Sequence, residues 1–221
     1  MEQKKEDCLV SCVDAGLGYE NRAIIEHLDF SVHRGEYICV VGENGSGKST
    51  LIRTLLGLLK PVSGKVELAP SLHGGAIGYL PQQTQAQKDF PASVWEVVLS
   101  GVLNNDHRCP FYNKKDKAEA EKNMEKLNIL DLKKRCYREL SGGQQQRVAI
   151  ARALASPAKV LLADEPTGNL DEEIADEIIK ILMKSAHEMG KSVIVVTHSK
   201  KIADAADVVL KIHEGKLYHL V

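Results

Sequence analysis

Two glycine-rich turns in this sequence carry residues that could bind phosphate groups. The upstream turn, Gly42 to Ser49, has the spacing Gly-x4-Gly-Lys-Ser and follows an apolar run. In that pattern backbone N–H groups surround phosphate oxygens, Lys48 neutralises their charge and Ser49 reaches a Mg²⁺ ion. The downstream turn, Leu140 to Gln144, reads Leu-Ser-Gly-Gly-Gln before a helical pattern. It is a second candidate phosphate site, and its alternative is an ordinary serine N-cap.

Acidic residues and a histidine follow two later apolar runs. Residues 160–163 end in Asp164 and Glu165, and residues 192–196 are followed closely by His198. Such continuous apolar runs indicate buried parallel strands, and ligands of open α/β sheets bind outside the carboxyl ends of the strands. Carboxylates at that edge could hold a hard cation or polarise a water molecule. The alternatives are a solvated acid for Glu165 and a structural role for His198.

The elements that must position these residues form an alternating pattern of strands and helices. Strands are expected at 9–13, 28–32, 37–41, 62–68, 77–80, 160–163 and 192–196, and a terminal hairpin at 208–221. Helices are expected at 50–59, 93–103, 116–127, 145–155 and 174–182. The β-α-β order implies a mainly parallel sheet. We expect one domain, 1–221, with a helical subdomain at about 83–140.

The composition fits this interpretation without requiring it. The chain has 221 residues, of which 43% are apolar, so it can bury a hydrophobic core. Its formal net charge of −1 shows no excess of basic residues of the kind that binds nucleic acid. Its five cysteines lack paired metal-ligand spacing, which favours reduced thiols in the cytoplasm. The charged start, Met1 to Asp7, lacks the apolar core of a signal peptide, and no apolar run approaches the ~20 residues that cross a bilayer. We expect a cytoplasmic protein without a nucleic-acid partner.

The order of these motifs resembles the ATP-binding-cassette (ABC) ATPases over essentially the whole chain. The resemblance is carried by Gly42 to Thr50, Gln82, Leu140 to Gln144, Val160 to Glu165, Asn169 to Asp171 and His198. In that family two subunits meet head to tail, so that the phosphate loop of one and the Ser-Gly-Gly turn of the other enclose one ATP. The resemblance implies an α/β P-loop NTPase core, an N-terminal antiparallel β region, a helical subdomain insertion, and a dimer that hydrolyses ATP.

The resemblance also implies a role for each site residue. ATP would be bound by Tyr19, whose ring would stack on adenine, and by the P-loop residues Gly42, Glu43, Asn44, Gly45, Ser46, Gly47, Lys48, Ser49 and Thr50. The ATP of the partner subunit would be bound by Ser141, Gly142, Gly143 and Gln144, and Mg²⁺ by Ser49, Gln82 and Asp164. The catalytic set would be Glu165 for the attacking water, His198 for the γ-phosphate, Gln82, and Asp171 for signalling between the two sites. Tyr19 could instead pack on the core, and Asp171 could also cap the following helix.

The segment after Gln82, about residues 83–103, is where transporters of the family receive a helix from a membrane subunit. The phrases Gly78 to Gln82, Asp89 to Pro91 and Val94 to Val98 are similar to the ATPase subunits of zinc, manganese and iron importers. The stretch Ala163 to Asp171 is similar instead to the ATPases of lipoprotein-release, macrolide-export and cell-division complexes. We give more weight to the first similarity because that segment faces the partner. It implies import of a divalent metal ion with a membrane permease and a solute-binding protein, on the inner face of the cell membrane.

Trp95 is the expected anchor of the contact with the permease. Large aromatic side chains at the centre of an interface carry much of its binding energy. The alternative is that Trp95 belongs to the core of the helical subdomain. Two further classes are a soluble cassette acting on DNA or ribosomes and a membrane-associated cassette that transports nothing. The single cassette without coiled-coil or zinc insertions argues against the first of these.

Overall fold

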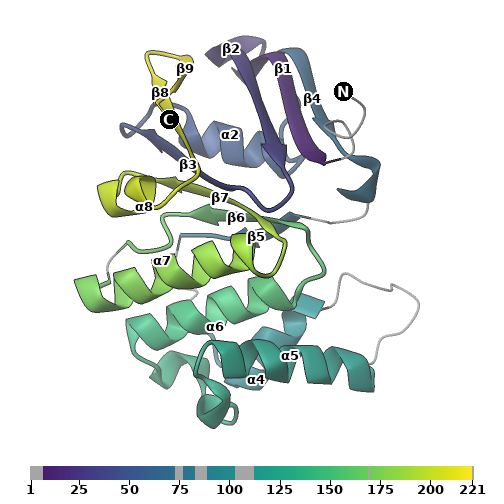
Figure 1. Ribbon diagram of the computed structural model, residues 1–221, viewed down its shortest axis with the longest axis vertical. Coiled ribbons are helices and arrows are strands. Elements are labelled where there is room, and N and C mark those ends of the chain that lie inside the picture. Colours follow the sequence, from purple (N-terminus) through teal and green to yellow (C-terminus); the bar gives the residue numbers. More distant parts are fainter. Residues whose placement is uncertain (1–6, 73–76, 83–88, 103–111, 169, 221) are drawn as a thin grey trace.

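The computed structural model describes residues 7–72, 77–82, 89–102, 112–168 and 170–220, which form two β-sheets and two groups of helices (Figure 1). The strands are β1 (Cys8–Tyr19), β2 (Arg22–His33), β3 (Tyr37–Gly42), β4 (Ser63–Leu68), β5 (Ile77–Leu80), β6 (Val160–Asp164), β7 (Ser192–Thr197), β8 (Val208–His213) and β9 (Lys216–His219). The helices are α2 (Lys48–Leu55), α4 (Val94–Leu99), α5 (Lys114–Lys126), α6 (Gly142–Ala155), α7 (Glu172–His187) and α8 (Lys200–Asp204). None of these helices is long and apolar enough to cross a membrane.

The central sheet has the strand order β5-β6-β7-β3-β8-β9, in which only the last pair, β8 and β9, is antiparallel. Strands β3, β6 and β7 are buried on both faces, which explains their continuous apolar sequences. Because these three strands are parallel neighbours, their carboxyl ends meet at one edge. That edge carries Gly42, Asp164 and Thr197, the last residues of the three strands.

One face of this sheet is covered by α2 and the antiparallel sheet β2-β1-β4 (Figure 1). The apolar side of α2, formed by Leu51, Ile52 and Leu55, packs in one cluster with side chains from both sheets. A backbone hydrogen bond from Glu26 N to Gly215 O (2.7 Å) joins the antiparallel sheet to the β8-β9 hairpin. The helix that begins at the phosphate loop is therefore held between two sheets.

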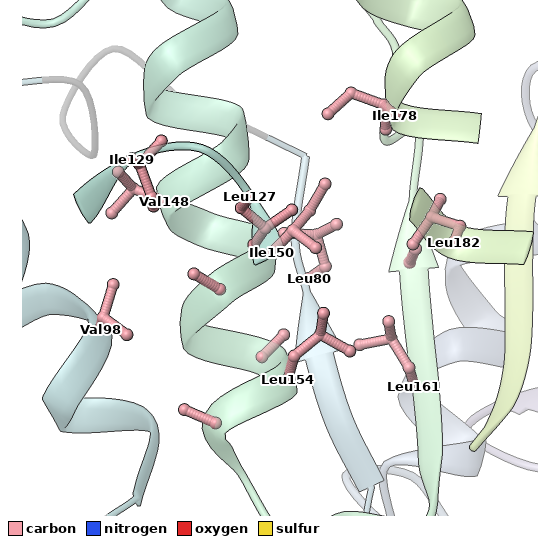
Figure 2. Close-up of a cluster of buried hydrophobic side chains, with 14 of the residues drawn as sticks. Leu80, Val98, Leu127, Ile129, Val148, Ile150, Leu154, Leu161, Ile178 and Leu182 are labelled. Atoms are coloured by element: carbon pink, nitrogen blue, oxygen red, sulfur yellow. The ribbon is translucent and has the colours of Figure 1, made fainter. Parts of the chain in front are cut away.

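The opposite face is covered by α7 and by α6, with α4 and α5 packed farther out (Figure 1). Figure 2 shows the buried contacts among these layers, which join the labelled residues Leu80, Val98, Leu127, Ile129, Val148, Ile150, Leu154, Leu161, Ile178 and Leu182. Helices α4 and α5 lie within the expected helical range of 83–140, but both pack on α6, which begins at Gly142. Because α6 buries residues around most of its circumference, it supports both the sheet and the outer helices.

The fold class expected from the sequence is confirmed, whereas several element boundaries differ from the expected ones, two of them for local reasons that the structure shows. Strand β1 continues to Tyr19 because a β-bulge between Cys12 and Ala15 shifts the alternation of buried side chains. Helix α2 ends at Leu55 rather than at residue 59, because Gly57 has φ +72° and ends the helix in a left-handed turn.

Candidate functional site

The phosphate loop, residues 42–47, joins β3 to α2 and contains two glycines with a left-handed backbone. Gly45 and Gly47 have φ values of +82° and +105°, which side-chain-bearing residues rarely adopt. A Cβ on Gly47 would also lie 2.7 Å from Cγ1 of Ile25, so the loop fits closely against β2. The sequence therefore fixes a tight loop whose backbone turns into the first turn of α2.

The ammonium group of Lys48, the first residue of α2, and the hydroxyl group of Ser46 lie at this loop. Lys48 Nζ donates hydrogen bonds to Gly42 O (2.7 Å) and Glu43 O (2.8 Å), so the ammonium is held by the loop itself. Ser46 Oγ is buried and has no hydrogen-bond partner among the described residues. An ammonium and a free donor beside a helix N-terminus are suited to an anionic ligand.

The loop forms one wall of a cavity of about 400 Å³ at the carboxyl edge of the sheet. The cavity is lined by Ile24, Asn44, Gly45, Gly47, Lys48, Ser49, Thr50, Gln82, Asp164, Glu165 and His198. Most of the candidate nucleotide residues and three of the four candidate catalytic residues therefore lie around one space. The structure brings them together from four separate segments of the chain, and Ile24 completes the lining.

Glu165 has both carboxylate oxygens occupied in this structure. Thr197 Oγ1 donates to Oε2 at 2.8 Å, and His198 Nδ1 lies 2.8 Å from Oε1. The backbone of Glu165 is left-handed (φ +46°), and its N–H donates to Val196 O at 2.8 Å. Its side chain is only 13% exposed, whereas that of His198 is 76% exposed. The carboxylate is thus placed by buried contacts on one side and by a solvent-facing one on the other.

Asp164 lies beside Glu165 in a half-buried position. Burial raises the pKa of Asp164, the adjacent Glu165 charge raises it further, and Lys48 opposes the rise. The Ser49 hydroxyl and the Gln82 amide line the same cavity. Carboxylate, hydroxyl and amide oxygens are the ligands that a hard cation takes, so these three residues fit a Mg²⁺ ion.

The Ser-Gly-Gly turn, residues 141–143, begins α6 in a different part of the molecule. Ser141 Oγ accepts from Gln144 N (3.3 Å) and Ser141 N donates to Gln144 Oε1 (3.0 Å), which makes a complete capping box. The turn borders a separate cavity of about 260 Å³. That cavity shares none of its described lining residues with the cavity at the phosphate loop.

Six site residues expected from the sequence do not line either cavity. Gly42, Glu43, Ser46 and Gly142 belong to the two glycine-rich turns, whereas Tyr19 and Asp171 lie in other parts of the chain. Tyr19 ends β1, is partly exposed, and accepts a hydrogen bond from Arg53 Nη1 (2.8 Å) on α2. Asp171 is the N-cap of α7, where Oδ1 accepts from Ile174 N at 3.0 Å. The capping role considered for Asp171 is present, and its signalling role and the stacking role of Tyr19 stay predictions.

An apolar groove of about 630 Å³ follows Gln82 on the face formed by β5, α4 and α6. It is lined by Tyr79, Leu80, Pro81, Phe90, Ala92, Glu96, Val97, Ser100, Tyr137, Ala149 and Arg152, and Phe90 is 54% exposed. Trp95 does not line it. Its ring packs against the core cluster and is covered by Lys133 Nζ, 4.0 Å from the ring centroid. The structure therefore favours the core alternative for Trp95 and places Phe90 and Val97 at the groove. Residues 83–88 and 103 of the expected coupling segment lie outside the described residues.

The sequence analysis did not single out Thr197, Ile24 or Gln146, which the structure places at or beside the site. Thr197 contacts Glu165, Ile24 lines the cavity, and Gln146 Nε2 donates to Pro166 O (2.6 Å), which joins α6 to the loop after β6. For Thr197 the signal was available, because it ends a buried strand beside the strand that delivers Glu165.

Comparison with known proteins agrees with this geometry. The ABC transporter family matches residues 25–168. The ATP-binding protein of a high-affinity zinc uptake system from Bacillus subtilis is 33% identical over 213 residues, covering 94% of this chain and 92% of that protein. The ATP-binding protein of a lipoprotein-releasing system from Rickettsia bellii is 37% identical over 205 residues, covering 88% of each. A dimeric ATP-binding cassette bound to ADP and phosphate has a TM-score of 0.79 and 26% identity, covering 96% of this chain and 99% of that one.

Proposed function

This chain belongs to the ABC transporter family as an ATP-hydrolysing ATP-binding subunit, and we propose that it drives the import of a divalent metal ion through a membrane permease. The observation that carries the proposal is the similarity to the zinc-uptake ATP-binding protein, which extends over 94% of this chain. That span includes the face beside Gln82, where the partner of the ATPase would bind. The transported ion would be bound by the partner proteins, as cargo.

We assign the cavity at the phosphate loop to the phosphates of ATP and to Mg²⁺. The P-loop residues 42–50 would surround the phosphates, and Lys48 would exchange its two carbonyl partners for phosphate oxygens. Ser49, Gln82 and Asp164 would hold the Mg²⁺, which supplies positive charge against the β- and γ-phosphates. Glu165 would orient the attacking water, and His198 would turn from Glu165 toward the γ-phosphate. Phosphoryl transfer to water needs mainly such positioning and charge stabilisation.

We infer that the second half of each ATP site comes from another copy of the chain. Ser141, Gly143 and Gln144 border a separate cavity. Together with Gly142 they would bind the ATP held by the phosphate loop of the partner subunit. A cassette with the same fold is dimeric when bound to ADP and phosphate, which supports this arrangement. It gives both glycine-rich turns a role at one composite site.

We propose that the apolar groove after Gln82 receives a helix of the permease on the inner face of the cell membrane. Phe90 offers exposed apolar surface there and the half-buried Val97 lines the groove, whereas Trp95 is engaged with Lys133. In this proposal residues 83–140 act as the helical subdomain of a single cassette, 1–221. A solute-binding protein would deliver the ion to the permease from the other side of the membrane.

A second candidate is the ATPase of a lipoprotein-release, macrolide-export or cell-division complex. It is favoured by the Rickettsia bellii relative, whose identity over its aligned region is slightly higher than that of the zinc-uptake relative. The stretch from Ala163 to Asp171 carries the same similarity. Asp164 and Glu165 of that stretch line the ATP cavity, however, whereas we assign partner choice to the groove after Gln82.

The test is deletion of the gene in its own cell, followed by measurement of radioactive zinc and manganese uptake. Loss of uptake, with growth that fails under chelation and recovers on added metal, is the expected result. Complementation with the wild type should restore uptake, and complementation with Lys48→Ala should not. Unchanged uptake together with lipoproteins retained in the wrong membrane fraction would replace the metal proposal by the second candidate.

A further inference from the structure

The contacts of Thr197 and His198 with Glu165 differ in a way that bears on hydrolysis. Both residues reach the same carboxylate at 2.8 Å, one at each oxygen. Thr197 is completely buried, while the His198 side chain is 76% exposed. The carboxylate therefore has one partner that is held in the core and one that faces solvent and is free to turn away.

The hydrogen-bond partners of the Thr197 hydroxyl determine which atom its hydrogen points to. Its oxygen accepts a hydrogen bond from Ser199 N at 3.1 Å, and the Glu165 carboxylate, when ionised, can only accept. The hydroxyl must then donate to Glu165 Oε2. A hydroxyl with both roles filled has little rotational freedom, so it fixes the position of that oxygen.

Sheet register explains why these two residues meet. Asp164 on β6 pairs with Val196 on β7. Glu165, the residue after β6, and Thr197, the last residue of β7, therefore lie side by side at the carboxyl edge. The N–H of Glu165 donates to Val196 O, which fixes the backbone from which the Glu165 side chain projects. The Thr197 hydroxyl then fixes the carboxylate at the end of that side chain.

We propose that Thr197 is a positioning residue that holds Glu165 Oε2 throughout the cycle, so that Oε1 faces the attacking water once His198 turns toward the nucleotide. The inference rests on the proposed role of Glu165 and is independent of the transported substrate. Misplacement of a reacting group by about 1 Å costs on the order of 100-fold in rate. Loss of the Thr197 hydroxyl should therefore lower kcat while leaving ATP binding intact.

The experiment compares Thr197→Val, which keeps the shape and removes the hydroxyl, with Thr197→Ser, which keeps the hydroxyl. We expect kcat for ATP hydrolysis to fall about 10- to 100-fold in Thr197→Val with little change in KM, and to stay within about threefold of wild type in Thr197→Ser. In a Glu165→Gln background, Thr197→Val should cause no further loss in single-turnover rate. If Thr197 had only a structural role, Thr197→Val would lower the rate whether or not the Glu165 carboxylate is present.

Ser192 supplies a matched control at the other end of β7. It is also fully buried, accepts from Gly35 N (3.1 Å) and donates to His33 O (2.8 Å), and neither of these partners is a candidate catalytic residue. Ser192→Ala should lower the melting temperature as much as Thr197→Val without a comparable loss of kcat. If Thr197→Val does not fold, Thr197→Ala and Thr197→Ser replace it, and the first must lose rate while the second keeps it.

Two results distinguish an error in the role proposed for Glu165 from an error in the role proposed for Thr197. If Glu165→Gln hydrolyses ATP at nearly the wild-type rate, the proposed role of Glu165 is wrong. If Glu165→Gln is slow but Thr197→Val keeps kcat within about threefold of Ser192→Ala, only the positioning role of Thr197 is overturned.

Discussion

The two glycine-rich turns of this protein both begin helices, but their surroundings differ. The phosphate loop faces a cavity completed by Gln82, Asp164, Glu165 and His198, which come from other segments of the same chain. The Ser-Gly-Gly turn borders a cavity without those groups, and its serine is occupied by its own capping box. The first region has the groups needed to bind nucleotide within one chain, whereas the second offers a helix N-terminus to a ligand held elsewhere.

The largest effect is expected from Lys48→Ala, which removes the cation of the first region. The remaining backbone N–H groups cannot offset the phosphate charge, so ATP affinity should fall at least ~100-fold in isothermal titration. Lys65→Ala, which removes an exposed lysine from β4, should bind ATP as the wild type does. Wild-type affinity in Lys48→Ala would remove the basis for assigning phosphates to the first region.

Ser141→Arg tests the second region, and it should separate binding from hydrolysis. ATP affinity of the isolated chain should be nearly unchanged, because this turn lies outside the phosphate-loop cavity, while hydrolysis should fall to roughly 1% as the side chain blocks the partner's γ-phosphate. Ser141→Ala is the control, since it loses the same N-cap without adding bulk. A large loss of ATP affinity in the isolated Ser141→Arg chain would mean that both turns serve one site in one subunit.

Mixing Ser141→Arg with Lys48→Ala asks whether the two regions meet across subunits. In a head-to-tail dimer of the two variants, one composite site has both defects and the other has neither. ATPase activity measured over a range of mixing ratios should rise above that of either variant alone. This recovery is expected if a single intact site can hydrolyse ATP.

Glu165→Gln should stabilise a dimer in which the first region of one subunit and the second region of the other enclose the same ATP. It keeps the shape of the side chain but loses the carboxylate, so hydrolysis should slow at least ~100-fold while ATP stays bound. Light scattering should then show a dimer with Mg-ATP and a monomer without it. A monomer under saturating Mg-ATP would contradict the shared site.

The smallest effect is expected from Asp171→Ala, at the loop before α7. Loss of the N-cap should lower the free energy of unfolding by about 1 kcal/mol, as in Asn113→Ala, which removes the N-cap of α5. If Asp171 also signals between the two sites, only Asp171→Ala should lower the ATPase rate of the dimer. Equal rates in the two variants would restrict Asp171 to capping.

Features that depend on contiguous residues could be predicted from the sequence. The phosphate loop is one of them, because the spacing of Gly42, Gly47 and Lys48 acts through local backbone conformation. The buried strands β6 and β7 are another, since continuous apolar runs indicate burial on both faces. Likewise Ser141 was recognised as opening a helix, and it caps α6.

Only the tertiary structure decided which of these local features face one another. Thr197 and Glu165 meet because β6 and β7 are parallel neighbours in register, and strand order depends on packing between distant segments. Trp95 and Phe90 look alike as apolar residues in sequence, yet the first packs on the core and the second is exposed at the groove. Periodicity tells which side chains are buried, but not which element buries them, because a burial pattern carries no information about the partner.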